Sequence, residues 1–378
     1  MTNAVCQMLG IEYPILAFSH CRDVVAAVSR GGGFGVLGAV AHSPEQLDID
    51  LRWIEEEVGD RPYGVDLLLP QKYVGAESGG FGRDELRALL PPEHQAFVDD
   101  LLTRYGVEPL AADTPTPMGG GMQMNVSPAG YEPLLDVAFD HRIRLVASAL
   151  GPPPVDLIER AGRHDVVVAA LSGTVRHAER HAAAGAQLIV AQGTEAGGHT
   201  GEVATMVLVP EVVDAVAPVP VLAAGGIARG RQIAAALALG AAGVWTGSVW
   251  LTTEESETHP IVKQKFLDAT SSDTVRSRSI TGKPARMLRS AWTDEWARAD
   301  TPDPLSMPLQ PLLVGPALAR VNRSAHQAGS GAEQLVNYFV GQVVGAATTV
   351  RPARIVLRDM VEELAEVLAT LPDAVVGS

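Results

Sequence analysis

Short runs of β-branched and aliphatic residues alternate along the chain with polar turns and alanine-rich amphipathic stretches. Parallel strands buried on both faces are almost continuously apolar, and these runs have that character. They predict eight strands, at 13–18, 34–39, 63–69, 143–148, 166–170, 187–191, 219–223 and 243–246. Strands that alternate with helices indicate an α/β fold, and eight such units closing on themselves form a TIM (β/α)8 barrel. A doubly wound open sheet is the alternative, because strand order cannot be read from one sequence.

The predicted helices have recognisable ends. Ser43, followed by Pro44 at the first helical position, is a typical N-cap of a helix over 43–58. Another helix is expected at 23–30, and Gly185 ends a helix just before a strand. The uncharged run 233–251 is near the minimum length of a membrane span. Its internal glycines favour a short helix, a turn and a buried strand instead.

Two segments fall outside the repeat. Residues 71–124 form an insertion after the third strand, with glycine-rich ends around a polar helix, and such a loop can form a lid. From about residue 270 the alternation stops, and amphipathic helices are expected at 333–345 and 356–371. The predicted organisation is a barrel over residues 1–270 and a C-terminal helical cap over residues 271–378.

Charge and cysteine content restrict the classes of partner. The 378 residues include 29 basic and 44 acidic side chains, a net charge of −15, which repels nucleic acid and anionic membranes. Two cysteines are too few for a disulfide framework, and the first residues lack the pattern of a signal peptide, so a cytoplasmic location is expected. We therefore expect a small-molecule substrate, and a homodimer is possible.

Two motifs have ordinary interpretations. Gly33, Gly35 and Gly38 match the GxGxxG spacing of a dinucleotide site, but here a helix precedes the glycines and a strand follows them. Close helix-to-strand packing is the expected role. His177 and His181 are four residues apart and could share a zinc ion, but charged neighbours favour a solvated helix face. No metal site is expected.

The sequence QGTEAGGHTG, residues 192–201, directly follows the sixth strand. Its glycines allow the backbone to approach a flat ligand, and His199 would then project into the barrel mouth, where TIM barrels carry their active sites. A neutral imidazole suits proton abstraction because its ordinary pKa is close to neutral pH. Most single histidines are packing or surface residues, but this position favours a catalytic base.

Two glycine turns follow the seventh and eighth strands. The first contains Ala224, Gly225 and Gly226 before a helix near residue 230, and the second contains Thr246, Gly247 and Ser248. In TIM barrels these two loops and a helix N-terminus commonly form a phosphate site. Either turn alone is a weak signal. Together, and next to the His199 loop, they predict a phosphorylated cofactor such as FMN.

Three stretches, AQGTEAGGHTG, PVLAAGGIARGRQIAAALALGAAGVWTGSVWLTTEES and TVRSRSITGKPAR, resemble the nitronate monooxygenases, formerly called 2-nitropropane dioxygenases. The resemblance is strongest over residues 130–290. The FMN-dependent enoyl-acyl-carrier-protein reductases are also similar, because they share the EAGGH loop. The resemblance implies a TIM barrel that holds FMN non-covalently at the strand ends.

In the function this implies, alkyl nitronates or nitroalkanes react with O2 and give carbonyl compounds and nitrite. His199 would remove the proton α to the nitro group, unless the substrate arrives as the nitronate anion. The resemblance and the strand ends together assign cofactor contacts to Ala17, Phe18, Ser19, Asp66, Gln192, Gly197, Gly198, Ala224, Gly225, Gly226, Thr246, Gly247 and Ser248.

The sequence departs from the family pattern at two strand ends. The family usually has a proline-methionine or glycine-methionine turn after the first strand, where this chain has Ser19, His20 and Cys21. His20 is either a second active-site imidazole or a rim residue, and Cys21 is expected to be a packing residue. In the third strand Asp66 replaces a common asparagine, and an ionised carboxylate cannot donate a hydrogen bond. Lys72 is either a cation near the flavin or a solvated loop residue.

These departures keep a second function open, an FMN-dependent NAD(P)H reductase or dehydrogenase acting on an enoyl, quinone or CoA-linked substrate. A basic cluster could bind the phosphate of an acyl carrier or CoA, although pairing with acidic neighbours is the more ordinary interpretation; it comprises Arg276, Arg278, Lys283, Arg286 and Arg289. A third possibility is a barrel that binds a phosphorylated ligand without catalysis. The intact EAGGH loop argues against it, because phosphate binding requires no imidazole there.

Overall fold

The computed structural model describes residues 3–69, 83–108, 127–327 and 329–376. Eight parallel strands form a closed barrel: β1 (Ile15–Ser19), β2 (Phe34–Gly38), β3 (Tyr63–Leu68), β4 (Leu145–Ala149), β5 (Val167–Ser172), β6 (Leu188–Gln192), β8 (Val221–Ala224) and β9 (Gly243–Thr246). β1 pairs with β9 to close the ring, with Ala17 opposite Thr246. The closed barrel confirms the TIM-barrel prediction and excludes the open sheet. Each predicted strand lies within about two residues of the observed one.

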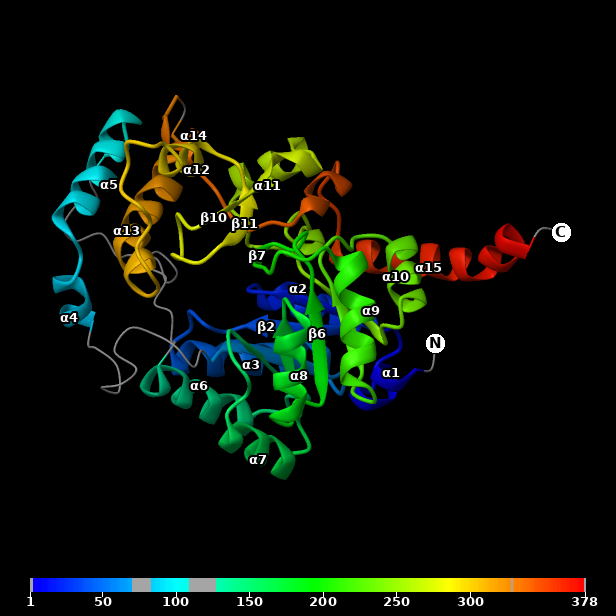
Figure 1. Ribbon diagram of the computed structural model, residues 1–378. Helices are drawn as coiled ribbons and strands as arrows, with labels where there is room; N and C mark the ends of the chain where they lie inside the picture. Colours follow the sequence, from blue (N-terminus) through cyan, green and yellow to red (C-terminus); the bar gives the residue numbers. More distant parts are fainter. Residues whose placement is uncertain (1–2, 70–82, 109–126, 328, 377–378) are drawn as a thin grey trace.

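In the described part of the chain, eight helices surround the barrel: α2 (Arg22–Arg30), α3 (Pro44–Val58), α6 (Pro128–Asp140), α7 (Val155–Arg163), α8 (Val175–Ala183), α9 (Thr205–Val216), α10 (Gly230–Ala238) and α15 (Ala353–Val376). The C-terminal helix α15 packs between α10 and α2, so it takes the place of the helix after the last strand, and its end extends beyond the barrel (Figure 1). Apolar side chains fill the barrel interior together with residues of the N-terminal helix α1 (Ala4–Leu9).

A second layer covers the carboxyl ends of the strands (Figure 1). It contains α4 (Arg83–Ala88), α5 (Pro92–Arg104), α11 (Pro260–Asp268), the hairpin β10 (Thr274–Ser277) and β11 (Ala285–Leu288), α12 (Ala291–Trp296), α13 (Leu309–Ser324) and α14 (Ala332–Leu335). Helix α5 of the insertion shares one apolar cluster with α11, α12 and α13. The glycine-rich ends of the predicted lid lie mostly outside the described residues. The division of the chain at residue 270 stays a prediction.

One predicted helix is wrong and one is confirmed. Residues 356–371 are helical within α15, but the stretch 333–345 contains only the short α14 and a 3₁₀ turn at Gln342–Ala346. Between them the backbone is extended, because Phe339 forms a bridge with Met287 and the Tyr338 carbonyl accepts a hydrogen bond from the Leu288 N–H. A partner strand far away in the sequence thus overrides a helical pattern.

Two glycine-rich stretches behave as predicted. A Cβ atom at Gly35 would lie 2.3 Å from the backbone oxygen of Val25, so this glycine allows α2 to pack closely on β2. The uncharged run 233–251 is divided among α10, β9 and a 3₁₀ turn at Ser248–Trp250. In the described part of the chain, no helix combines the length and apolar character that a membrane span requires.

Candidate active site

A cavity of about 720 Å³ lies at the carboxyl ends of the barrel strands, below the second layer. The predicted residues that line it are Phe18, Ser19, His20, Asp66, Gln192, Gly197, Gly198, His199, Ala224, Gly225, Gly226, Thr246, Gly247 and Ser248. Ala17 does not line the cavity, because its side chain is buried in the apolar layer between the barrel and the outer helices. Lys72 lies outside the described residues. The fold therefore brings the predicted histidine loop and both glycine turns to one cavity.

His199 belongs to a two-residue strand, β7 (Gly198–His199), that pairs with β11 of the hairpin. Its Nε2 atom lies 2.8 Å from the Thr281 hydroxyl oxygen, and that hydroxyl donates to the Lys283 carbonyl. The hydroxyl oxygen therefore accepts the Nε2–H of His199, and Nδ1 is the unprotonated nitrogen. Burial, with a smaller contribution from the positive charge of Lys283, lowers the pKa of His199 to about 4. The imidazole is thus neutral at pH 7.

Hydrogen bonds to distant residues hold the EAGGH loop. The Glu195 carboxylate accepts from the backbone N–H and from the hydroxyl of Thr205, at the start of α9. Arg286 of β11 donates to the Thr194 carbonyl oxygen at 2.7 Å. Sequence reasoning did not assign these roles, because nothing near Glu195 or Arg286 in the sequence identifies a partner. Their effect is to fix the backbone that leads into Gly197 and Gly198.

The two glycine turns form a cradle with room for a ligand. Gly226 has a φ of +73°, which favours glycine, and its carbonyl accepts a hydrogen bond from the Gln232 amide of α10. A Cβ atom at Gly247 would contact only Phe18, at 3.9 Å, so the missing side chain leaves cavity space. The Ser248 hydroxyl oxygen accepts from the Gly341 N–H at 2.7 Å. A backbone cradle of this kind suits a phosphate group.

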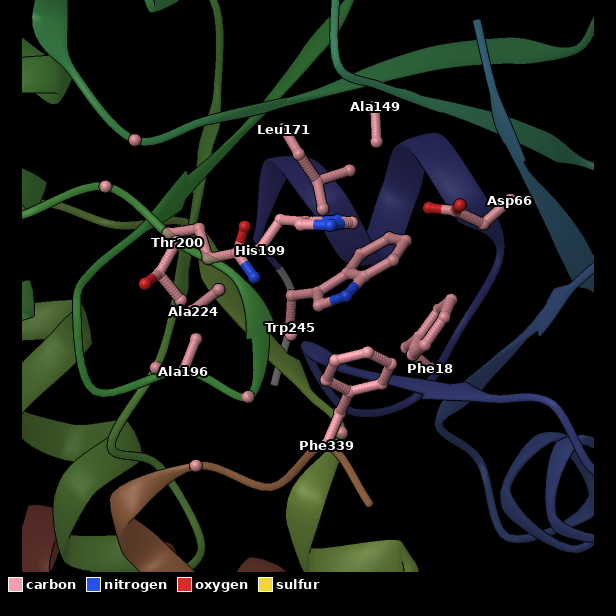
Figure 2. Close-up of a pocket in the computed structure, with 18 of the residues that line it drawn as sticks. Phe18, Asp66, Ala149, Leu171, Ala196, His199, Thr200, Ala224, Trp245 and Phe339 are labelled. Carbon is pink, nitrogen blue, oxygen red and sulfur yellow. The ribbon is translucent and has the colours of Figure 1, made fainter. Parts of the chain in front are cut away.

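Aromatic side chains form much of the cavity wall. Figure 2 shows Trp245 near the centre, with His199, Phe18 and Phe339 around it. The Phe18 and Trp245 rings stack with their centroids 6.2 Å apart, and the Phe339 ring lies 6.4 Å from that of His199. Flat apolar walls suit a flat heteroaromatic ligand. Trp245 and Phe339 were not predicted as site residues, because they look like ordinary residues of a buried strand and of a helix.

Asp66 points into the cavity from β3 (Figure 2). Its side chain is buried, and no hydrogen bond or ion pair compensates the charge among the described residues. Burial raises the pKa of Asp66 to about 8, so the carboxyl group is mostly protonated at pH 7. A protonated carboxyl can donate a hydrogen bond, as an amide does. The replacement of asparagine at this position therefore preserves a donor.

His20 and Cys21, which follow β1, have different environments. The His20 Nδ1 atom lies 2.9 Å from the Gly38 carbonyl, so it carries the proton, and the ring packs edge-on against Phe18. His20 lines the cavity, and burial lowers its pKa. The Cys21 thiol instead donates to the Glu255 carbonyl oxygen and is buried outside the cavity. His20 thus contributes an imidazole to the site, while Cys21 is a packing residue.

Comparison with known proteins shows what this chain is related to. The family model described as nitronate monooxygenase matches residues 3–364. The chain belongs to the nitronate monooxygenase family. A protein of Mycobacterium tuberculosis (strain ATCC 25618 / H37Rv), provisionally named monooxygenase Rv1533, is 67% identical over 371 residues, which is 98% of each chain. The chain is therefore an oxidoreductase of a flavin-dependent type, as the resemblance noted from the sequence implied.

Two solved structures are similar over nearly the whole length of this nitronate monooxygenase family member. Nitroalkane oxidase from Streptomyces ansochromogenes superposes with a TM-score of 0.79 at 27% identity, covering 97% of this chain and 99% of that one. FabK from Thermotoga maritima superposes with a TM-score of 0.72 at 26% identity, covering 99% and 100%. The two resemblances noted from the sequence are thus both confirmed at the level of structure.

Most side chains of the basic cluster bind other groups of this protein. Arg276 donates to the Thr200 carbonyl, Arg278 donates to the Gly282 and Pro304 carbonyls, and Arg289 pairs with Asp294. These arginines therefore hold the β10–β11 hairpin against neighbouring segments. Most of their hydrogen bonds are to backbone oxygens, and the sequence pattern did not indicate these partners. Lys283 differs from them, because it lines the cavity.

The prediction of a solvated face for His177 and His181 is only half right. His177 is exposed, but His181 is buried, and its Nε2 atom lies 3.2 Å from the Leu171 carbonyl. Burial lowers the pKa of His181 to about 4. Both residues lie at the edge of the cavity. Their place at the cavity arises because the first turns of α8 face the end of β5, which the charged neighbours in the sequence did not indicate.

We expect Asp66→Asn to stabilise the protein most at alkaline pH. A carboxyl whose pKa is raised to about 8 on folding, from about 4 in the unfolded chain, makes the unfolding free energy fall as pH rises from about 4 to 8. The variant lacks this loss of stability. The difference in unfolding free energy between the variant and the parent therefore increases by roughly 2–4 kcal/mol between pH 5 and pH 8. Urea unfolding of the cofactor-free proteins at several pH values measures it. If the unfolding free energies of the variant and the parent changed in parallel with pH, the raised pKa of Asp66 would be contradicted. The control is Asp60→Asn, which makes the same change at an exposed carboxylate.

Proposed function

We propose that this protein is an FMN-dependent nitronate monooxygenase that oxidises alkyl nitronates and nitroalkanes with O2 to carbonyl compounds and nitrite. The observation that carries the proposal is the convergence of the His199 imidazole and two glycine turns on one aromatic-walled cavity. The family match and the similarity to a nitroalkane oxidase support the same reaction class.

The residues present fit FMN. Gly226, Gly247 and Ser248 would hold its phosphate, and Phe18 and Trp245 offer apolar surface to its ring system. Protonated Asp66 would donate a hydrogen bond to a ring acceptor. When bound, FMN supplies the redox chemistry by accepting electrons from the substrate and passing them to oxygen.

The role of His199 depends on the substrate's protonation state. With a neutral nitroalkane, the unprotonated Nδ1 atom would accept the α proton, while Thr281 holds the ring through Nε2. A base with a pKa of about 4 is weak for this task, because general bases act best when their pKa is near the working pH. A nitronate has already lost that proton. The site is therefore better suited to nitronates than to neutral nitroalkanes.

One experiment tests the proposal directly. The purified protein is examined for a flavin spectrum, and the cofactor released by denaturation is identified by mass. Oxygen consumption and nitrite release are then measured with the nitronates of nitroethane and 2-nitropropane, and compared with anaerobic flavin reduction by NADH and NADPH. We expect FMN, turnover with the nitronates, and no rapid reduction by either nicotinamide. A protein without flavin, or without nitronate turnover, would overturn the proposal.

A second function follows from the similarity to FabK, whose structure matches over nearly all of this chain. In that case NAD(P)H would supply electrons to FMN, and an enoyl, quinone or CoA-linked compound would receive them. Rapid anaerobic reduction by NADH or NADPH without nitronate turnover would favour this reductase. These arginines already bind Thr200, Pro304 and Asp294 of this protein, which counts against an acyl-carrier phosphate site there.

A further inference from the structure

The loop between β10 and β11 presents two side chains to the catalytic histidine. Ala285, the first residue of β11, is directly opposite His199 in the antiparallel register. The loop residues just before it therefore lie beside the imidazole: Thr281 contacts Nε2, and the charge of Lys283 acts on the ring. The turn requires glycine at position 282, where φ is +78° and a Cβ atom would lie 2.1 Å from the Leu305 carbonyl oxygen.

The Lys283 ammonium has no partner among the residues that the structure describes. No hydrogen bond or ion pair holds its Nζ atom in the described ranges, whereas the arginines of the same hairpin are occupied. Burial alone lowers the pKa of Lys283, with no carboxylate opposing the effect. Burying a cation without a counter-charge is energetically unfavourable, and at such sites a ligand commonly supplies the negative charge.

The acidic side chains that line the described cavity do not supply a negative charge to balance Lys283. Glu195 is bound to the N-terminal turn of α9 through Thr205. Asp66 projects from β3 and is mostly protonated at neutral pH. The wall around His199 and Lys283 therefore favours a small anion, because attraction to a fixed charge is strong at a partly buried site.

We propose that Lys283 anchors the substrate of this enzyme by binding the nitro-group oxygens of an alkyl nitronate, with the α carbon of that nitronate at His199. Lys283 is then a specificity residue that selects the anionic form of the substrate over the neutral form. The proposal rests on the proposed function. It gives a substrate-binding role to the loop between β10 and β11, which has no role in a site made of the glycine turns and His199 alone.

The test compares Lys283→Met, Lys283→Arg and a charge-matched control, Arg289→Met, with the parent holoenzyme. Arg289 is an exposed residue of the same hairpin that does not line the cavity, so its loss changes the net charge equally. We expect Lys283→Met to raise KM for ethyl nitronate about 30-fold or more and to leave KM for neutral nitroethane nearly unchanged. Lys283→Arg should recover most of the affinity, and Arg289→Met should behave like the parent.

A pH profile separates an electrostatic role from a merely structural one. Loss of the Lys283 charge raises the pKa of His199, so the acid limb of kcat/KM for nitroethane should move to higher pH in Lys283→Met and stay in place in Lys283→Arg. An unmoved limb, together with unchanged KM for the nitronate, would overturn the proposal. Loss of FMN affinity in Lys283→Met would also overturn it, by assigning the ammonium to the cofactor.

Equilibrium binding distinguishes failure of this inference from failure of the proposed function. Nitrite, a planar oxyanion, is titrated into the flavin-loaded proteins, and the flavin absorbance reports binding without any turnover. We expect nitrite to bind the parent and Lys283→Arg at least about 10-fold more tightly than Lys283→Met. Equal nitrite affinity in all three proteins would contradict the anion anchor, whatever the parent oxidises. Nitrite binding without nitronate turnover would refute only the proposed reaction.

Discussion

His199→Asn is expected to retain its flavin and to lose most of its activity on neutral nitroalkanes. Asparagine keeps polar atoms at this position, but an amide cannot accept a proton at neutral pH. Loss of a general base typically lowers the rate by about 10²–10⁴-fold. With preformed nitronates, which need no deprotonation, we expect a loss of less than about 10-fold. Oxygen consumption with nitroethane and with ethyl nitronate, each as kcat/KM, measures the difference.

The pH dependence of the parent checks the same assignment. Because His199 must be neutral to accept a proton, kcat/KM for nitroethane should rise with pH through about 4 and be level near neutrality. His177→Asn, at the exposed edge of the cavity, is the matched control and should keep the activity of the parent. Equal kcat/KM of His199→Asn and the parent on nitroethane would refute the role of His199 as base.

Gly247→Val is expected to weaken FMN binding strongly while the barrel still folds. The added Cβ atom would contact only Phe18, at 3.9 Å, so the cofactor-free protein has room for it. The same side chain would occupy space in the phosphate cradle, and overpacking of a fitted site costs about 1–3 kcal/mol or more. We expect FMN affinity to fall about 100-fold, with the Tm of the cofactor-free protein within about 2 °C of the parent. Titration with FMN followed by fluorescence quenching, and thermal unfolding, measure the two effects.

The control for this variant is Gly162→Val, which makes the same change on the exposed surface of α7. No atom lies within 4 Å of a Cβ at Gly162, and Gly162 does not line the cavity. It should bind FMN as the parent does. Unchanged FMN affinity in Gly247→Val would place the phosphate elsewhere, and a large loss of Tm would show that Gly247 serves the fold.

Residues close together in the sequence were the ones whose roles could be predicted. The eight strands were recognisable because buried parallel strands are continuously apolar, and Ser43 was recognisable because N-caps have a local pattern: its hydroxyl accepts from the Gln46 N–H. The helix expected at 333–345 failed because the extended stretch around Phe339 is set by pairing with Met287. A local pattern contains no information on that partner.

The residues of the candidate site also fall into two groups, those that a local sequence motif identified and those that only the structure revealed. The EAGGH loop and the glycine turns were identified from the sequence, because each is a short local motif at the end of a predicted strand. Arg286, Thr281 and Lys283 were not assigned to the His199 environment, since they are more than 80 positions away along the chain and reach it only through the pairing of β11 with β7. The protonated state of Asp66 also depends on burial, which the sequence does not show.

By itself, then, the amino-acid sequence determined the barrel, the histidine and the glycine cradle, because strand periodicity and loop motifs are properties of neighbouring residues. Only the tertiary structure decided which nitrogen of His199 is free, which charges reach it and which wall is aromatic. Those properties depend on distance and burial in space, and both arise when the hairpin and the extended stretch around Phe339 pack over the open end of the barrel.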